Sequence, residues 1–282
     1  RLSRYTVEYW AKDFMTTLQS KMQIKQEIQI PKIQDGLKKQ LLHAFNAAKQ
    51  KMIFLDYDGT LVEFNEKPDL ATPDAKLLQL IDALCALPNN DVAIVSGRDQ
   101  AFLDKWFASL PVTLIAEHGY YVKRNGADWT GIGSNNKDWM TDVMPIFETF
   151  TDRTPGTFVE EKNNSLVWHY RKTDPELASE RVVEIKTVLS SLISDKLTIL
   201  DMDKALEVVD RQVNKGSAVF EINSQGAYDF TLCIGDDITD ENMFDSLPEN
   251  AYTIKVGRKP TSAKYYIENV SQVKKLLSSI VS

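Results

Sequence analysis

Two aspartates in the stretch FLDYDGTLV (residues 54–62) are the first side chains of this sequence whose type and spacing could do chemistry. Asp56 and Asp58 follow an apolar run that is typical of a buried strand, and Gly59 indicates the turn that ends it. Removing two carboxylates from water at such a place costs free energy. One explanation is that one of them caps the next helix while the other faces water. The alternative is a site that needs both carboxylates.

A second acidic cluster follows another apolar run, in LCIGDDITDENMF (residues 232–244). Its carboxylates are those of Asp236, Asp237, Asp240 and Glu241. Acidic residues are common at helix starts, so this cluster alone carries little weight. Combined with Asp56 and Asp58, it implies several carboxylates in one place, which repel one another unless a cation joins them. An all-oxygen ligand set without neighbouring Cys or His favours Mg²⁺ over zinc.

Two further polar positions could bind a phosphoryl group. Lys215, in VNKGSA, stands at an expected helix start, and Ser96, in IVSGR, offers a hydroxyl and nearby backbone N–H groups at a strand end. Each has an ordinary alternative, a surface lysine or a serine that caps a helix. Together with Mg²⁺ they make a site complementary to a phosphoryl group, whose charge must be stabilised during transfer.

The elements that would position these residues alternate in a way that predicts an α/β fold. Residues 51–58, 91–98 and 112–119 read as strands, and amphipathic helical patterns lie between them, the first opened by Thr72 and Pro73. Strands that are apolar on both faces form a parallel sheet covered by helices, here a Rossmann-like core. Ligands bind beyond the carboxyl ends of such strands. DYDG, SGR and EHG all stand at those ends, so we expect them to meet at one edge.

The alternation of apolar strands and helices stops after residue 120. An Asn125-Gly126 pair predicts a hairpin turn, and residues 156–172 read as two alternating strands around Asn163-Asn164. A helix and two more strands follow before the strand–helix rhythm returns near Phe230. We therefore expect three parts, namely a helical N-terminal extension or linker at 1–48, a catalytic core at 49–120 and 210–282, and an inserted α+β cap at 121–209.

The composition limits the class of protein. The chain has 282 residues, 43% of them hydrophobic, which suffices for one large domain or two modest ones. With 33 Lys and Arg against 40 Asp and Glu, the net charge of −7 argues against nucleic-acid binding. Cys85 and Cys233 stand far apart in apolar surroundings and read as core thiols of a reducing compartment, which favours the cytoplasm. No stretch approaches the roughly 18 apolar residues of a membrane span.

The first 48 residues have a helical pattern, in which Val7, Trp10, Phe14 and Leu18 share one amphipathic face. The stretch lacks an initiator Met and the apolar centre of a signal peptide, so we expect the chain to be part of a longer polypeptide. We interpret these residues as a packing or linking segment without chemistry of its own.

The polar motifs, in their order along the chain, resemble those of the haloacid dehalogenase superfamily of phosphohydrolases. They are DYDGT (56–60), Ser96 in SGR, Lys215, and GDDITDE (235–241). The resemblance implies that Asp56 attacks phosphorus to form an aspartyl phosphate. It also implies that Asp58 protonates the leaving oxygen and then activates the hydrolytic water. Positions i and i+2 of a strand point to the same side, which gives the spacing of these two aspartates a reason.

The same resemblance implies the remaining roles at the expected site. The metal Mg²⁺ is held by Asp56, Asp236 and the backbone carbonyl of Asp58, with Asp237 and Asp240 completing or orienting that shell. The phosphate oxygens are held by Ser96, Gly97 and Lys215.

Three further stretches resemble the trehalose-6-phosphate phosphatase family. They are AEHG (116–119), VEEKNNSLVWHYR (159–171) and LEV (206–208). The resemblance implies hydrolysis of trehalose 6-phosphate in trehalose biosynthesis, with substrate contacts from Glu160, Lys162, Glu207, Arg171 and His118. Charged groups suit a hydroxyl-rich sugar because they fix its orientation through hydrogen bonds. The alternatives are a solvated cross-strand ion pair for Glu160 and Lys162, and a loop-stabilising role for His118.

Other readings stay open. One is another sugar-phosphate phosphatase, such as one acting on sucrose phosphate; others are a non-catalytic regulatory module and a phosphoaspartate receiver. In addition, Val209 and Asp210 stand where many relatives have Arg-Pro, which could change the hinge or the grip on the substrate. The stretch YWAKDFM (residues 9–15) resembles the tail of a trehalose-phosphate synthase-like domain. This resemblance implies a larger polypeptide of the fungal synthase/phosphatase type and a place in a trehalose-making assembly.

Overall fold

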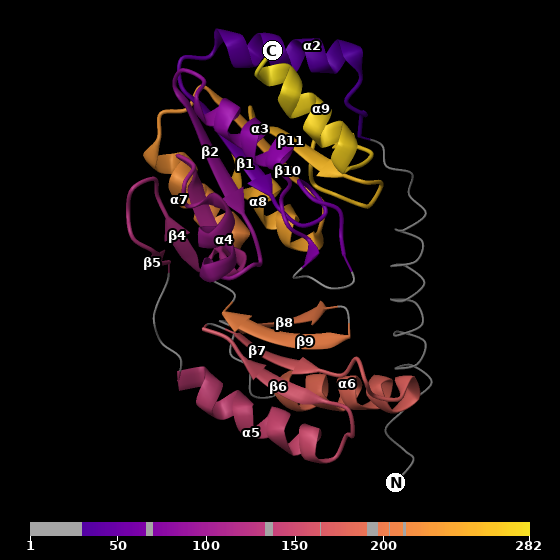
Figure 1. The fold of residues 1–282 in the computed structure, drawn as a ribbon. Helices are drawn as coiled ribbons and strands as arrows, with labels where there is room; N and C mark the ends of the chain where they lie inside the picture. The colour runs from indigo at the N-terminus through magenta and orange to yellow at the C-terminus, as the bar shows by residue number, and fades with distance from the viewer. Residues whose placement is uncertain are drawn as a thin grey trace.

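The protein is described by a computed structural model that covers residues 30–65, 70–132, 138–163, 165–190, 197–202, 204–210 and 213–282. The expected amphipathic helix with Val7 and Trp10, and the YWAKDFM stretch, lie outside these residues. Figure 1 shows a large unit of helices around a sheet and, below it, a smaller unit with a sheet of its own.

The large sheet confirms the α/β expectation. Its strand order is β12-β11-β10-β1-β2-β3-β4-β5. The parallel strands are β1 (Lys51–Asp56), β2 (Asn90–Val95), β3 (Thr113–Ala116), β10 (Phe230–Gly235), β11 (Tyr252–Val256) and β12 (Tyr265–Ile267). The short strands β4 (Tyr121–Lys123) and β5 (Thr130–Gly131) continue the sheet in antiparallel pairing.

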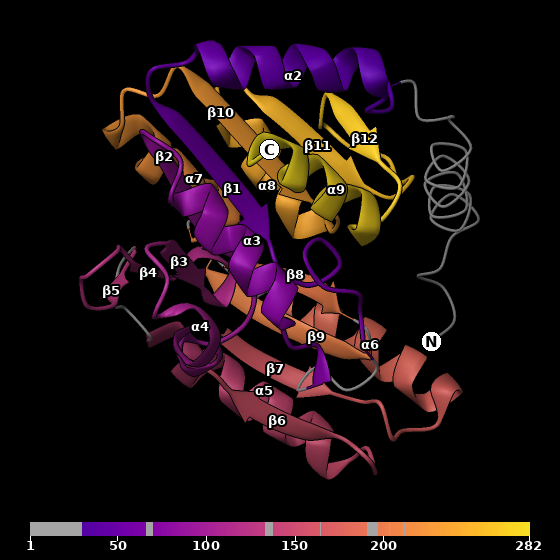
Figure 2. The same ribbon diagram turned by 45° about the horizontal axis from the view of Figure 1, so that its top comes forward.

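Helices cover both faces of this sheet, as Figure 2 shows. On one face are α2 (Asp35–Ala47), α3 (Ala75–Cys85), α4 (Gln100–Phe107) and α9 (Val270–Ile280), and on the other α7 (Lys215–Gln225) and α8 (Glu241–Ser246). Alternate residues of β1 point to the two faces of the sheet. Ile53 and Leu55 belong to the hydrophobic cluster under α2, α3, α4 and α9, whereas Met52 and Phe54 belong to the cluster under α7 and α8. Because all six residues of β1 are buried, this strand forms the centre of the core.

Local side-chain bonds set where the helices begin. The carboxylate of Asp74 accepts from the backbone N–H of Leu77 at 2.7 Å, so α3 begins after Asp74, and the expected opening at Thr72 and Pro73 is wrong. Asn214 caps α7 in the same way by accepting from the N–H of Ser217 at 3.0 Å. That cap places Lys215 in the first turn of α7.

The smaller unit is a four-stranded antiparallel sheet of order β6-β7-β9-β8. Its strands are β6 (Phe158–Glu161), β7 (Ser165–His169), β8 (Leu197–Met202) and β9 (Ala205–Asp210). Two helices, α5 (Asp138–Asp152) and α6 (Pro175–Ser190), pack on one face through a cluster that includes Trp168, Leu206 and Phe147. The opposite face is turned toward the large unit (Figure 1).

Two segments near the expected domain borders pack on the large unit. The β4–β5 hairpin, which the sequence placed at the start of the cap, pairs with β3 of the large sheet. The N–H of Ile33 donates to the carbonyl of Tyr266 at 2.9 Å, so the chain before α2 runs beside β12. Leu41 and Phe45 of α2 are buried in the core, which confirms a helix there. The division into three parts stays a prediction.

Candidate active site

A buried ion cluster lies at the carboxyl ends of the central strands. The Nζ atom of Lys215 donates to Oδ1 of Asp56 and to Oδ1 of Asp240, each at 2.7 Å. The three side chains are 4%, 4% and 0% exposed. Carboxylate oxygens of Asp56, Asp236 and Asp240 lie within 4.8 Å of one another. The structure thus brings together side chains from opposite ends of the large unit's sequence.

The sheet register explains this meeting. In the parallel pair β1–β10, Leu55 lies beside Ile234, so Asp56 and the loop after Gly235 emerge at the same edge. Gly59 has φ of +81°, and a Cβ there would lie 2.5 Å from the carboxylate of Asp236. Glycine at position 59 therefore permits both the turn and the close approach of the two acidic loops.

Asp240 organises the loop that carries Asp236. Its Oδ2 atom accepts from the backbone N–H groups of Asp236 and Asp237 at 2.8 and 2.9 Å, while its Oδ1 accepts from Lys215. The hydroxyl of Thr60 reaches Oδ1 of Asp236 at 3.4 Å. Asp237 itself is half-buried and follows the strand end.

The cluster holds more negative than positive charge. Burial, followed by the charges of Asp240 and Asp236, raises the pKa of Asp56 against the opposing effect of Lys215. Burial and the neighbouring carboxylates of Asp240 and Asp237 raise the pKa of Asp236 to about 6. Burial alone would lower the pKa of Lys215, but the charges of Asp240 and Asp56 outweigh it and hold that pKa above its usual value. The Oδ2 atom of Asp56 is buried and has no hydrogen-bond partner among the described residues. An unpaired carboxylate oxygen in an all-oxygen, net-negative cluster fits a divalent cation.

An arginine binds the carboxylate of Asp58. Nε and Nη2 of Arg98 donate to the two carboxylate oxygens of Asp58 at 2.8 and 2.6 Å. The guanidinium lies over the ring of Phe102, 4.6 Å from its centroid. The buried hydroxyl of Ser96 accepts from the backbone N–H of Arg98 at 3.0 Å. The strand end at Ser96 therefore positions the partner of Asp58.

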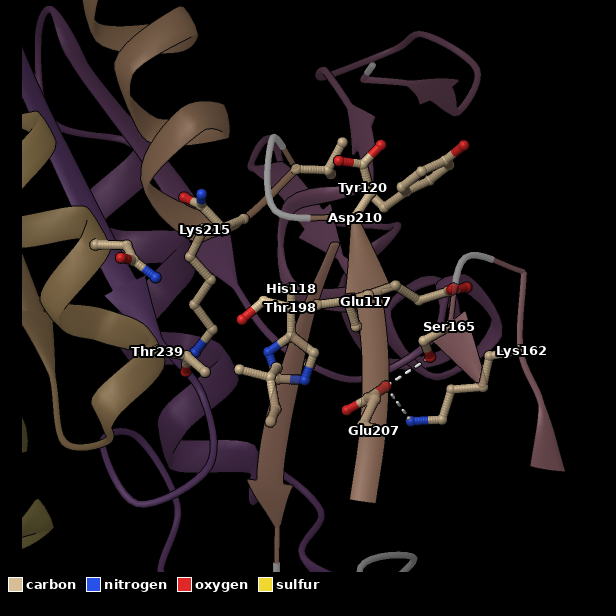
Figure 3. Close-up of a pocket in the computed structure, with 16 residues that line it drawn as sticks. Glu117, His118, Tyr120, Lys162, Ser165, Thr198, Glu207, Asp210, Lys215 and Thr239 are labelled. Carbon is tan, nitrogen blue, oxygen red and sulfur yellow. Dashed lines mark hydrogen bonds and ion pairs between the residues drawn. The ribbon is translucent and has the colours of Figure 1, made fainter. Parts of the chain in front are cut away.

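A cavity of about 220 Å³ lies between this edge of the large sheet and the facing side of the small sheet. Figure 3 shows Lys215 reaching in from one side, Glu207 and Lys162 on the other, and the ring of His118 between them. Its lining includes Gly97, His118, Lys162, Ser165, Glu207 and Lys215. The cavity therefore has an ionic end in the large unit and a polar wall in the small one.

Glu207 is the centre of the polar wall. It is 2% exposed, and its Oε1 accepts from Ser165 Oγ at 2.6 Å and from Lys162 Nζ at 3.2 Å. Burial raises its pKa, but the charge of Lys162 and the hydrogen bonds from Ser165 and Lys162 oppose this effect, and the pKa is lowered overall. Glu207 is therefore ionised at neutral pH and can accept hydrogen bonds from hydroxyl groups.

His118 stands in a left-handed backbone conformation, with φ of +57°. Its ring packs on Gly97, where a Cβ would lie 2.4 Å from Nε2. Burial, followed by the charge of Lys215, lowers the pKa of His118 to about 4, so the imidazole is neutral at neutral pH. Its buried Nδ1 has no hydrogen-bond partner among the described residues.

Comparison with known proteins decides the family. The model of the family described as trehalose-phosphatase matches residues 54–271. The chain belongs to the trehalose-phosphatase family. It is 38% identical to a bifunctional trehalose-6-phosphate synthase/phosphatase of Thermoproteus tenax, over 99% of this chain and 39% of that protein. It is 36% identical to the trehalose-phosphatase of Saccharomyces cerevisiae, over 86% of this chain and 30% of that protein.

The same comparison extends to solved structures. The C-terminal domain of trehalose-6-phosphate phosphatase from C. albicans matches with a TM-score of 0.77 and 31% identity, over 89% of this chain and 98% of that domain. The chain thus spans about a third of the length of the curated relatives above and nearly all of a phosphatase domain. Membership in this trehalose-phosphatase family confirms the expected superfamily and fold and implies a divalent metal. The fungal type of the parent polypeptide stays a prediction.

Two predicted substrate contacts lie outside the cavity. Glu160 shares the cavity-facing side of the small sheet with Lys162, but it lies on the edge strand β6 and its Oε2 is 2.7 Å from Nε2 of His169. Arg171 follows β7 and is exposed. Lys162, Glu207 and His118 do line the cavity.

Sequence reasoning missed two residues of this site. Arg98 is the last residue of SGR, and a cation two residues after Ser96 at a strand end was a usable signal. Ser165 carried a weaker signal, since its contact with Glu207 depends on how β7 pairs with β9. Among the described residues, no helix has the length and apolarity needed to cross a membrane.

Proposed function

We propose that this chain hydrolyses trehalose 6-phosphate to trehalose and phosphate, as a step of trehalose biosynthesis. One observation carries the proposal: Lys215, which bonds to Asp56 in the buried cluster with Asp236, also lines a cavity whose opposite wall presents Glu207 and Lys162. The first set suits a phosphoryl group and the second suits a sugar.

In the proposed reaction, a carboxylate oxygen of Asp56 bonds to phosphorus while the bond from phosphorus to the sugar oxygen breaks. Asp58 gives its proton to that oxygen. Water then attacks the aspartyl phosphate, Asp58 takes up a proton from it, and Asp56 is regenerated as phosphate leaves. Because Arg98 holds both carboxylate oxygens of Asp58, this side chain must exchange Arg98 for the sugar oxygen when the substrate binds.

For the divalent metal we propose Mg²⁺. Asp56, Asp236 and the backbone carbonyl of Asp58 would hold it, and Asp240 would orient the loop, with Asp237 beside it. When bound, the ion supplies positive charge that stabilises the phosphoryl oxygens during transfer. Lys215, Ser96 and the backbone at Gly97 would hold the remaining phosphate oxygens.

We propose that the small unit acts as the cap that selects the sugar. The ionised carboxylate of Glu207, the ammonium of Lys162 and the neutral ring of His118 offer acceptors and donors to hydroxyl groups. Glu160 and Arg171 would join them only if the small unit moves relative to the large one.

The cellular setting is also proposed. The names of the relatives that join synthase and phosphatase suggest that this chain works within a trehalose synthase/phosphatase assembly. Cys85 and Cys233 are free thiols, and Cys233 is buried, which supports a reducing compartment such as the cytoplasm.

Phosphate release from purified protein tests the activity. We expect turnover of trehalose 6-phosphate with Mg²⁺ to exceed that of sucrose 6-phosphate, because Glu207 and its neighbours on the cavity wall would hydrogen-bond to the hydroxyl groups of the preferred sugar. Equal turnover of both esters would contradict the substrate, and no release from any sugar phosphate would contradict the phosphatase itself.

A further inference from the structure

A second buried lysine lies behind the loop that carries Asp236. Lys255, in strand β11, has a side chain that is 2% exposed. Its Nζ atom donates to the backbone carbonyl of Asp237 at 2.8 Å and to Oε1 of Glu241 at 2.6 Å. Lys255 does not line the cavity described above, so a direct contact with the substrate is not its role.

Glu241 extends this attachment to a neighbouring loop. Its Oε2 atom accepts from the hydroxyl of Thr261 at 2.9 Å and from the backbone N–H and hydroxyl of Ser262 at 2.7 and 3.1 Å. Both carboxylate oxygens of Glu241 are therefore engaged, one by Lys255 and the other by the segment after β11.

The acidic loop at residues 236–241 is thus held from two sides. On the cavity side, Lys215 and two backbone N–H groups hold Asp240. On the far side, Lys255 holds the carbonyl of Asp237 and the side chain of Glu241. Because the carboxylates of this loop repel one another and Asp56, a loop without the second attachment would relax away from β1.

We propose that Lys255, paired with Glu241, is a positioning residue for the divalent-metal site. It holds the loop so that Asp236 meets Asp56 before the metal arrives, and the metal then binds without the cost of ordering its ligands. The inference rests on the metal site of the proposed function. It does not depend on the identity of the sugar.

The test separates positioning from charge and from stability. The double variant Lys255→Met/Glu241→Gln removes one positive and one negative charge, so the net charge near the metal is unchanged. We expect the Kd for Mg²⁺, measured by titration calorimetry on the full chain without substrate, to rise by about tenfold or more. The Mg²⁺ concentration for half-maximal activity should rise in parallel, while kcat at saturating Mg²⁺ and the KM for substrate stay within about twofold of wild type.

A matched control is available in the same sheet. Lys51 is also buried and donates to the carbonyl of Pro88 at 2.9 Å, but it lies at the opposite end of β1 from Asp56. Lys51→Met should lower the melting temperature and leave the Kd for Mg²⁺ unchanged. Lys255→Arg keeps the charge and the donors and should restore Mg²⁺ affinity to within about threefold of wild type.

A folded double variant that binds Mg²⁺ with the wild-type Kd would overturn the proposal, whatever its melting temperature. Should the double variant fail to fold, Thr261→Val/Ser262→Ala decides, because it removes two hydroxyl donors to Glu241 without changing any charge. A Kd raised several-fold in that variant supports positioning, and an unchanged Kd refutes it. Because Mg²⁺ binding needs no sugar ester, a chain that binds the ion as expected but leaves trehalose 6-phosphate intact would refute only the proposed substrate.

Discussion

Replacement of Lys215 by Met tests whether this lysine balances the buried carboxylates. Met fills a similar volume, so the variant removes the charge and the two 2.7 Å bonds to Asp56 and Asp240 without opening a large cavity. Removing one partner of a buried ion pair costs about 3–5 kcal/mol because the other charge stays buried. For a domain of this size, about 2–4 °C is lost per kcal/mol, so the melting temperature should fall by roughly 6–20 °C.

The loss should depend on pH in a defined direction. Burial and the charges of Asp240 and Asp236 still raise the pKa of Asp56 in the variant, and the opposing effect of Lys215 is gone. A carboxyl whose folded pKa lies above its unfolded value stabilises the fold at low pH and loses that contribution as pH rises through the folded pKa. The pH window of this loss opens at the ordinary carboxyl pKa of 3.8, above which the pKa of Asp56 is raised, and it includes the pKa of about 6 of Asp236. The deficit of Lys215→Met should therefore be larger at pH 8 than at pH 5.

Thermal unfolding of metal-free protein, followed by circular dichroism in EDTA at both pH values, measures this deficit. Wild type and Lys51→Met serve as references, since Lys51 is a buried lysine far from the carboxylates. If the melting temperature of Lys215→Met lay within about 2 °C of wild type at pH 8, the lost stability would be about 1 kcal/mol or less. That result would refute the claim that Lys215 balances the buried carboxylates. A deficit that is larger at pH 5 would refute the assignment of the raised pKa.

Four further results are expected from the proposed roles. Asp56→Asn should abolish phosphate release and keep the native circular dichroism spectrum, because the amide is a far weaker nucleophile than the carboxylate. Turnover above a few per cent of wild type would exclude Asp56 as the nucleophile. EDTA should stop activity and added Mg²⁺ should restore it, whereas full activity in chelator would contradict the metal site. Lys162→Ala should reduce kcat/KM for trehalose 6-phosphate far more than for a small phosphate ester, and equal losses would mean that Lys162 does not read the sugar. Arg98→Met should lower kcat/KM for trehalose 6-phosphate by about 10–100-fold because Asp58 loses the partner that positions it before the substrate binds. For p-nitrophenyl phosphate kcat/KM should change little, because it reports the loss of a leaving group that needs no proton and not the later hydrolysis that Asp58 assists; equal losses would show that Arg98 acts elsewhere.

The pattern of apolar and polar residues along the chain was enough to predict the large unit and the ionic end of the site. Two-sided apolar strands alternating with helices allow few arrangements, and parallel strands end at one edge. Asp56, Asp236 and the first turn of α7 therefore had to come close once β1 paired with β10. The motifs then indicated the family, which the comparisons confirmed.

The sequence could not predict in the same way which side chains of the small sheet reach the cavity. An alternation of two assigns Glu160 and Lys162 to one face, but it does not say which of them reaches the cavity. That choice depends on where the small unit docks. In the structure Lys162 donates to Glu207, whereas Glu160, on the edge strand β6, pairs with His169 of β7.

The amino-acid order thus decided which side chains gather at the ends of the central strands, because strand pairing and periodicity are properties of short stretches. The packing of distant segments decided which cation each carboxylate meets, namely Arg98 for Asp58 and Lys255 for Glu241. These partners lie 40 and 14 positions apart and follow no repeat. They meet only because folded loops bring them within hydrogen-bond distance, where burial makes each unpaired charge costly.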